Sequence, residues 1–244
     1  MKFLKNKLSL FNLAGIAVLS AVLMMSSCSD DDDNSGPEQQ AKVKVINGIY
    51  DNPDYIIKVN GTDLSSTPLA YRKSTDYVSV SANDPELVVT EQSSNKVVLT
   101  SKLAVAPGTN TSIYLEAASA TEPAGSFQID DDLTTVTAKK AKIRFVNVSP
   151  DGGSLDLLLN GQAVATSATG IAPKKASPFI EIDPVAGATF SLRQTGTDNI
   201  LATVPNVNVE EGQFTTLWAV GTQSLSANPA AKLAVGVIVN KSAK

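Results

Sequence analysis

The side chains of this chain that could do chemistry are mainly carboxylates and aromatic rings. The densest acidic cluster beyond the N-terminal segment is Asp130, Asp131 and Asp132. Neighbouring carboxylates offer oxygen ligands to a calcium-type cation, with Asp51 or Asp54 as further donors. A run of like charges is also typical of a solvated strand end. These aspartates are therefore candidate metal ligands, although we expect no bound metal or other cofactor.

Two aromatic residues occupy matching positions in two predicted strands. Tyr114 lies in 111–116 and Trp218 lies in 214–220. Alternation along a strand turns Tyr114 outward when its neighbours turn inward, and the same pattern turns Trp218 outward, although its strand is apolar on both faces. Exposed rings would form stacking platforms for sugars, which makes both residues candidate ligand contacts. The alternative is packing at the rim of a sandwich or at a domain junction.

Catalytic constellations are scarce in the sequence. The chain has no histidine, which excludes a Ser-His-Asp or Cys-His site and histidine-ligated metals. Ser93 to Lys96 match S-x-x-K, but that chemistry requires a helical turn, and the four residues lie between two predicted strands. Asp151, in a Pro-Asp-Gly turn, and Asp156 are expected to be structural. We therefore expect no catalytic residue and a protein that is not an enzyme.

A repeated scaffold carries these residues. Residues 41–64 align with residues 141–164 without a gap, and six of the 24 positions are identical, including Asn47/Asn147 and two Asn-Gly pairs. A repeat of this length indicates one folded unit used twice. Short alternating strands, about seven per hundred residues, are typical of a β-sandwich. The sequence thus predicts an all-β protein with two tandem antiparallel β-sandwich domains, module 1 over residues 41–138 and module 2 over residues 139–244.

The first strand of each module shows the alternation that assigns the core. Val43 and Val45 are expected to face inward and Lys44 outward. In module 2 the same pattern turns Phe145 inward and Arg144 outward.

The N-terminal segment has the pattern of an export signal. An apolar run from Leu13 to Met25 follows three lysines, and the only cysteine, Cys28, comes after two serines. The run is shorter than the roughly 20 apolar residues that span a bilayer. Cys28 resembles the lipidated cysteine of a bacterial lipoprotein, with Met25 where an aliphatic residue is usual. We therefore predict a signal peptide over residues 1–27 and lipidation at Cys28.

Residues 28–40 are polar and acidic, and we expect a disordered, lipidated tether. Acidic residues directly behind the cysteine resemble a signal that sends some lipoproteins to the outer face of the outer membrane. We predict a lipid-anchored, surface-exposed protein of the outer membrane, and a periplasm-facing spacer is the alternative. The chain has net charge −4, and loss of residues 1–27 would leave 17 basic against 24 acidic residues. This balance disfavours nucleic acid as a partner.

Three segments carry a family resemblance: AKIRFVNVSPDGGSLDLLLNG, EEGQFTTLWAVG and IDDDLTT. They resemble the domain of unknown function 4397 family, over residues 41 to about 240. The resemblance implies exported, often lipid-anchored proteins with tandem sandwich modules of the immunoglobulin or transthyretin type, and it implies no activity. Module 1 departs from the pattern at Tyr50, Asn52-Pro53 and Ile56.

These features together predict a non-enzymatic, lipid-anchored cell-envelope protein that acts as a binding or structural module. Its expected partners are the membrane, through the lipid, and a glycan or protein ligand. One alternative is a glycan-binding or carboxylate-dependent glycan-processing accessory protein. Another is an adhesin or an envelope assembly component that uses an exposed strand edge.

Overall fold

A computed structural model describes residues 39–50, 54–118, 123–224 and 229–243. The chain from Pro37 onward forms one compact unit. The predictions for the signal peptide, the lipidated Cys28 and most of the tether fall outside the described residues, as does Asp51. Among the residues that are described, no helix is long and apolar enough to cross a membrane.

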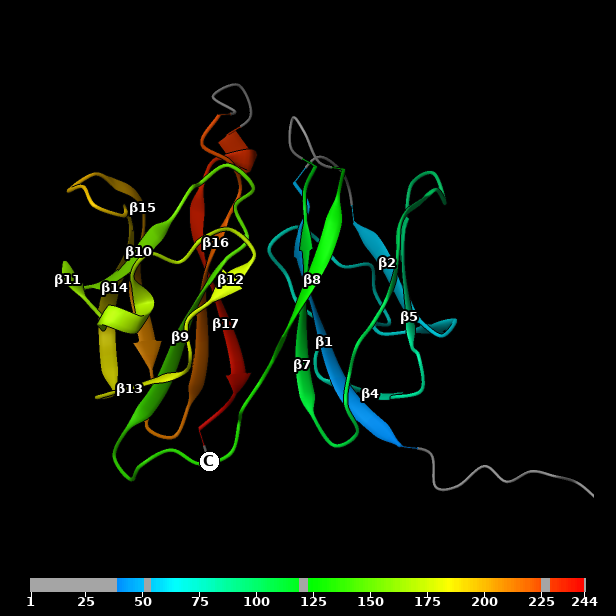
Figure 1. Cartoon of the computed structure of the whole chain (residues 1–244), viewed down its shortest axis with the longest axis horizontal. Coiled ribbons are helices and arrows are strands. Elements are labelled where there is room, and N and C mark those ends of the chain that lie inside the picture. The colour runs from blue at the N-terminus through cyan, green and yellow to red at the C-terminus, as the bar shows by residue number, and fades with distance from the viewer. Residues whose placement is uncertain (1–38, 51–53, 119–122, 225–228, 244) are drawn as a thin grey trace, which may run out of the picture. The chain divides into compact units, whose positions relative to one another are not determined.

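Module 1 contains two four-stranded sheets (Figure 1). In the first, the strand order β4-β1-β7-β8 corresponds to Val78–Ser81, Gln40–Gly48, Asn110–Glu116 and Gly125–Asp130. In the second, the order β3-β2-β5-β6 corresponds to Thr62–Asp63, Tyr55–Val59, Glu86–Glu91 and Val97–Lys102.

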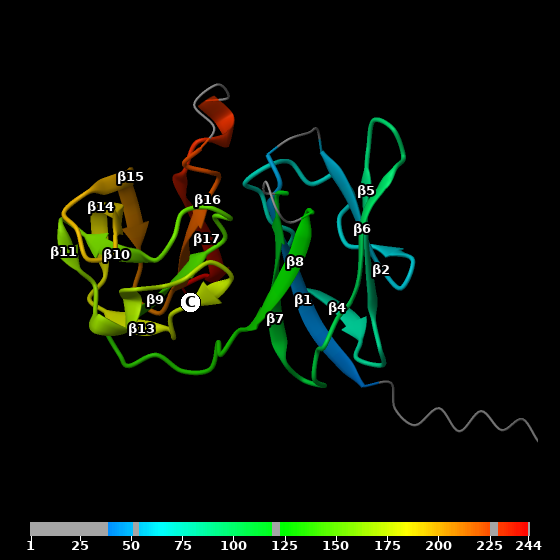
Figure 2. The ribbon, with the colours of Figure 1, turned by 45° about the horizontal axis from the view of Figure 1, so that its top comes forward.

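Module 2 repeats this plan (Figures 1 and 2). Its first sheet has the order β12-β9-β16-β17, formed by Lys175–Ala176, Ala141–Asn147, Phe214–Val220 and Ala234–Lys241, and β13 (Ile180–Ile182) also pairs with β9. Its second sheet has the order β11-β10-β14-β15, formed by Gln162–Ala163, Leu155–Leu159, Val185–Gln194 and Ile200–Val209. Two single-turn 3₁₀ helices, η1 (Thr166–Ala168) and η2 (Pro229–Ala231), complete the described elements.

The all-β prediction is confirmed, and the structure adds one feature to it. Most strand pairs are antiparallel, but β1 pairs with β7 in parallel, and β9 pairs with β16 in the same way. Each of these pairs joins the first strand of a module to a late strand. Side-chain alternation reports which face a residue takes and not the direction of the neighbouring strand, so the sequence could not reveal this.

The matched asparagines and Asn-Gly pairs of the repeat have the same structural roles in both modules. Asn60 and Gly61 have φ of 50° and 77°, and Asn160 and Gly161 have φ of 50° and 82°. These positive angles build the tight turns that the Asn-Gly pairs predict. The fully buried Asn47 donates to the Leu69 carbonyl at 3.0 Å, and Asn147 donates to the Ile171 carbonyl at 2.9 Å. The matched asparagines are therefore structural.

Each module has its own hydrophobic core between its two sheets. In module 1 the core includes Val43 and Val45, and in module 2 it includes Phe145, as the alternation predicted. A third cluster is made of residues from both modules. It contains Ile46, Tyr114, Val146, Val148, Trp218, Val220 and Ile238. We call the surface around this third cluster the junction.

Candidate functional site

The two candidate ligand contacts lie in the junction. Tyr114 and Trp218 are both 0 % exposed. Each ring does face out of its own sandwich, as alternation predicted, but the outward face of one module is covered by the outward face of the other. The prediction of exposed sugar platforms is therefore wrong for Tyr114 and Trp218, and the alternative of packing at a domain junction holds.

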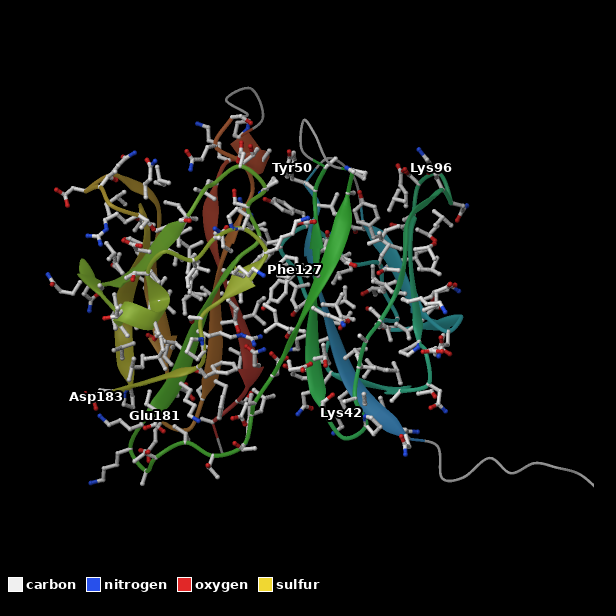
Figure 3. The ribbon with its side chains drawn as sticks, viewed as in Figure 1. Lys42, Tyr50, Lys96, Phe127, Glu181 and Asp183 are labelled. Atoms are coloured by element: carbon white, nitrogen blue, oxygen red, sulfur yellow. The ribbon has the colours of Figure 1, made fainter. Side chains whose placement is uncertain are left out.

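The aromatic rings of the junction contact one another, and a glycine makes room for the largest of them. Tyr114 stacks on Phe127 with ring centroids 5.4 Å apart, and Trp218 lies 6.1 Å from Tyr114 on the other side of the junction. Figure 3 shows Phe127 on β8, directed toward this cluster. Gly236 pairs with Trp218 across β16 and β17, and a Cβ atom at Gly236 would overlap the indole. The glycine therefore makes room for the larger ring.

An ion pair crosses the junction beside these rings. The Arg144 guanidinium of module 2 pairs with the Asp131 carboxylate of module 1, and their side chains are 2 % and 0 % exposed. Asp131 Oδ2 also accepts hydrogen bonds from the hydroxyls of Ser112, at 2.6 Å, and Tyr77. Arg144 donates through Nε to Thr216 Oγ1 at 2.9 Å. Buried charges persist in folded proteins when they are paired and hydrogen-bonded in this way.

Further polar groups extend the same network. Asn240 Nδ2 donates to the Tyr77 hydroxyl at 3.1 Å, and Lys44 Nζ donates to the Val239 carbonyl at 3.1 Å. Burial raises the pKa of Tyr77, and the nearby Asp131 carboxylate raises it further. Burial lowers the pKa of Lys44, against an opposing effect of Asp76 and Asp131. Lys44 and Arg144 do point out of their own sandwiches, but the junction buries both.

The three candidate metal ligands do not converge on one point. Asp130 accepts from Thr111 Oγ1 at 3.0 Å, and Asp132 accepts from Thr134 Oγ1 at 2.6 Å, so both act at an exposed strand end. Asp131 is neither solvated nor free for a metal, because its cation is Arg144. Over the described residues, no three acidic, cysteine or histidine side chains are placed to hold a metal ion together.

Asp151 and Asp156 each fix a loop. Asp151 accepts hydrogen bonds from Thr222 Oγ1 and from the Gln223 and Ser224 amides, so it holds the segment after β16. The buried Asp156 pairs with Arg193 at 2.8 Å. Asp156 also accepts from Thr195 Oγ1 at 2.7 Å and from the Gly170 amide at 2.9 Å. Burial would raise both carboxyl pKa values, but the hydrogen bonds lower them below the usual range.

Ser93 to Lys96 form the predicted hairpin loop between β5 and β6, and Figure 3 shows Lys96 at its tip. The hydroxyls of Ser93 and Ser94 donate to the Glu91 carboxylate at 2.7 and 2.9 Å. Asn95 has φ 55°, a turn conformation. The serine and lysine are therefore not on a helix, and the geometry of a serine–lysine catalyst is absent from this loop.

A cavity of about 570 Å³ lies beside the segment that joins the modules. Its lining includes Glu210, Glu211, Lys241, Phe214 and the segment 134–136. Lys241 Nζ donates to the Leu133 carbonyl at 2.8 Å, and Glu211 accepts from the Lys139 amide at 2.8 Å. A glycosidase needs two carboxylates on opposite sides of its substrate. Glu210 and Glu211, the carboxylates that line the cavity, are neighbours in one turn.

Sequence reasoning missed Arg144 and Gly236 as junction residues. The sequence carried a signal of a covered outer face, because the strand that contains Trp218 is apolar on both faces. Lys44 and Arg144 are also cations at matching positions of the repeat. Strands buried on both faces read as continuous apolar runs. That pattern indicates a covered outer face, but it does not say what covers it.

Comparison with known proteins supports the family resemblance. The family model described as Domain of unknown function (DUF4397) matches residues 41–158, which span module 1 and reach into β10 of module 2. The resemblance is thus confirmed over these residues, and its extension to about residue 240 stays a prediction. No curated protein matches the chain.

Two solved structures are similar to the chain only in a distant way. One is a carbohydrate-binding module of family CBM26 from Amy13K of Eubacterium rectale, in complex with maltoheptaose, with 12 % identity and a TM-score of 0.26 over 84 % of this chain and 98 % of that one. The other is a proposed cell adhesion protein from Bacteroides eggerthii, with 10 % identity and a TM-score of 0.22 over 84 % and 97 %. Likeness at this level carries no argument about ligand or role.

Proposed function

From the resemblance of residues 41–158 to the DUF4397 family, we propose that this protein is a non-enzymatic, lipid-anchored component of the cell envelope that acts as a binding or structural module. The observation that carries the proposal is the junction. A buried ion pair and a buried aromatic cluster fix two sandwiches in one arrangement. Such a fixed pair holds the outer surfaces of the two modules in a constant relation to each other, which suits a binding or structural module.

The chemistry of the folded part supports a role without catalysis. Among the described groups that the sequence offered for catalysis or metal binding, Asp131, Asp156 and Ser93 each form a structural bond. The proposal of a lipid anchor is based on Cys28 and the apolar run before it. The acidic residues that follow Cys28 support the proposal of a surface-exposed position on the outer membrane.

The cavity beside the joining segment favours a second candidate function, the binding of a glycan or another small polar ligand. Its mixed lining offers the carboxylates of Glu210 and Glu211, the ammonium of Lys241 and some apolar surface. Ligand sites of this size commonly combine apolar walls with a few polar groups that orient the ligand.

The anchor is tested by expressing the full chain and its Cys28→Ser variant with a radiolabelled fatty acid. Cys28 is the only cysteine, so we expect label in the membrane fraction for the parent chain and an unlabelled variant. Equal labelling of the two proteins would contradict lipidation at Cys28. Protease treatment of intact cells then separates the two locations, because a periplasm-facing protein would survive it.

The ligand is sought with residues 37–244, the compact unit, on a glycan array and in a pull-down from envelope extract. Any glycan that binds is tested against Glu210→Gln and Lys241→Met, with the exposed Lys58→Met in module 1 as the matched control. Loss of binding in the cavity variants alone supports the second candidate. Turnover of the glycan would contradict a non-enzymatic role.

A further inference from the structure

The two faces that meet at the junction are copies of one surface. The parallel ladders place Lys44 beside Ser112 in module 1 and Arg144 beside Thr216 in module 2. The same ladders match Tyr114 with Trp218. On the other side of the first strand, Val78 of β4 pairs with Val43, and Ile180 of β13 pairs with the equivalent Ile143. Tyr77 and Phe179, the residues just before these strands, are therefore equivalent. In module 1, Ser112 pairs with Ile129 of β8, and Asp131 lies two residues after Ile129. In module 2, Thr216 pairs with Ile238 of β17, and Asn240 lies two residues after Ile238, so Asp131 and Asn240 are equivalent.

The contacts within each face repeat along with the residues. Ser112 Oγ donates to Asp131 at 2.6 Å, and Thr216 Oγ1 donates to Asn240 at 2.6 Å. Lys44 Nζ lies 4.8 Å from the centroid of the Tyr77 ring, and Arg144 Cζ lies 4.7 Å from that of the Phe179 ring. Each module therefore presents the same arrangement of one cation on one ring, next to a hydroxyl bonded to a short polar side chain.

The contacts across the junction are reciprocal. Arg144 reaches the end of the partner face at Asp131, and Lys44 reaches the matching end at the Val239 carbonyl. In the middle, Tyr114 and its equivalent Trp218 contact each other. A surface that contacts its own equivalent in this way is the mark of a two-fold, isologous interface, the kind that joins identical subunits. The junction thus has the form of a dimer interface inside one chain.

Differences between the two faces favour pairing of module 1 with module 2 over pairing of two like modules. A carboxylate stands only on the module 1 face, so two module 2 faces would bury two Arg144 guanidiniums without a counter-charge. A Cβ atom on Gly48 would lie 2.5 Å from the Leu115 carbonyl of its own module and 3.2 Å from Val148, its equivalent in module 2. Two module 2 faces would therefore set valine against valine at this point. Two module 1 faces would set two pairs of Tyr114 and Phe127 rings against each other, where the junction sets one such pair against Trp218.

We propose that the junction face is a self-recognition surface whose further partner is a second copy of this chain. Two chains pair by reciprocal exchange, so that module 1 of each binds module 2 of the other. The exchanged dimer reuses both junctions unchanged, and only the segment between Asp131 and Ala141 takes a new path. Exchange of identical elements is a low-cost route to dimers because no new contact has to be built. The Asp131/Asn240 difference restricts the pairing to unlike modules.

The first test uses residues 37–244 with a protease site inserted between Thr135 and Val136, cleaved after folding. We expect the two fragments to remain a one-to-one complex in native mass spectrometry. When isotopically heavy and light cleaved proteins are mixed, we expect heavy and light fragments to combine in statistical proportions as unlike pairs. Fragments that separate as monomers at micromolar concentration, or that form module 2 pairs, would overturn the proposal.

The second test refolds intact heavy and light chains together from denaturant over a range of protein concentrations. The mixed dimer should increase with concentration and persist on dilution. Val97→Lys is the control, because Val97 is 52 % exposed on the edge strand β6 and a dimer formed by strand-edge pairing would be lost in that variant. An exchanged dimer keeps forming with Val97→Lys. Asp131→Asn weakens the same junction in the monomer and in the exchanged dimer, so it lowers the unfolding free energy of both forms. Monomers at every concentration, or a dimer that Val97→Lys abolishes, would refute module exchange.

Discussion

Replacing either member of the Arg144–Asp131 pair tests the account of the junction most directly. Asp131→Asn keeps the shape of the side chain but leaves the Arg144 guanidinium buried without a counter-charge. Arg144→Met keeps the length of the side chain and leaves the Asp131 carboxylate with only the hydroxyls of Ser112 and Tyr77. The double variant removes both charges together.

The burial of the pair sets the expected magnitude. Both side chains are at most 2 % exposed, and breaking a buried pair by removing one partner costs roughly 3–5 kcal/mol. Each single variant should therefore lose this amount of unfolding free energy, which is a drop of roughly 10 °C in Tm for a chain of this size. The double variant should lose much less than the sum of the two, with a coupling free energy of about 2–3 kcal/mol.

Urea unfolding followed by Trp218 fluorescence measures all four proteins, because Trp218 is the only tryptophan and lies in the junction. The losses should persist at 1 M salt, where the Debye length is about 3 Å and exposed pairs are screened. Lys58→Met is the control, since the Lys58–Asp63 pair is 41 % and 55 % exposed and should contribute about 0–1 kcal/mol. Additive single losses, or losses that salt removes, would refute a buried pair across the junction.

Three further outcomes follow from the structure. Gly236→Ala should lower the unfolding free energy by about 1–3 kcal/mol, because its Cβ meets the buried indole of Trp218. Gly125→Ala is the control, because its Cβ meets only the flexible end of Glu116 and should lower the unfolding free energy much less. Equal losses in the two variants would contradict the close fit of Gly236 to Trp218. A neutral quencher should leave Trp218 emission nearly unchanged, and quenching as strong as that of free indole would contradict its burial. The pKa of Asp156 is lowered in the folded state, so its contribution to stability is present above its unfolded pKa of about 3.9 and is lost as the pH falls through the folded value. Asp156→Asn should therefore flatten the acid limb of the stability curve, and an unchanged acid limb would contradict the role of the Arg193 pair.

Much of the fold follows from short-range pattern. Alternation correctly assigned Val43, Val45 and Phe145 to the cores, and the Asn-Gly pairs correctly marked two tight turns. These predictions succeed because a strand's inner face and a turn's positive φ are properties of a few neighbouring residues. The parallel pairing of β1 with β7 joins segments about seventy residues apart, and no local pattern encodes the direction of such a partner.

The candidate site was harder to predict than the fold. Tyr114 and Trp218 were correctly matched to each other and correctly turned outward, yet their exposure was wrong. Exposure depends on what covers an outer face, and here the cover is the other module. For the same reason Asp131 looked like a solvated carboxylate or a metal ligand, when its partner Arg144 lies 13 positions along the chain in the next module.

The sequence by itself determined the repeat, the all-β fold, the absence of histidine and the single cysteine at position 28. It also placed an aromatic ring and a cation on the outer faces of each module. Only the tertiary structure decided that these faces meet each other, that Arg144 and Asp131 neutralise each other across the junction, and that Gly48 and Gly236 leave room for the contact. The physical reason is that pairing of two surfaces depends on charge and shape summed over both, which becomes visible only when the two are in contact.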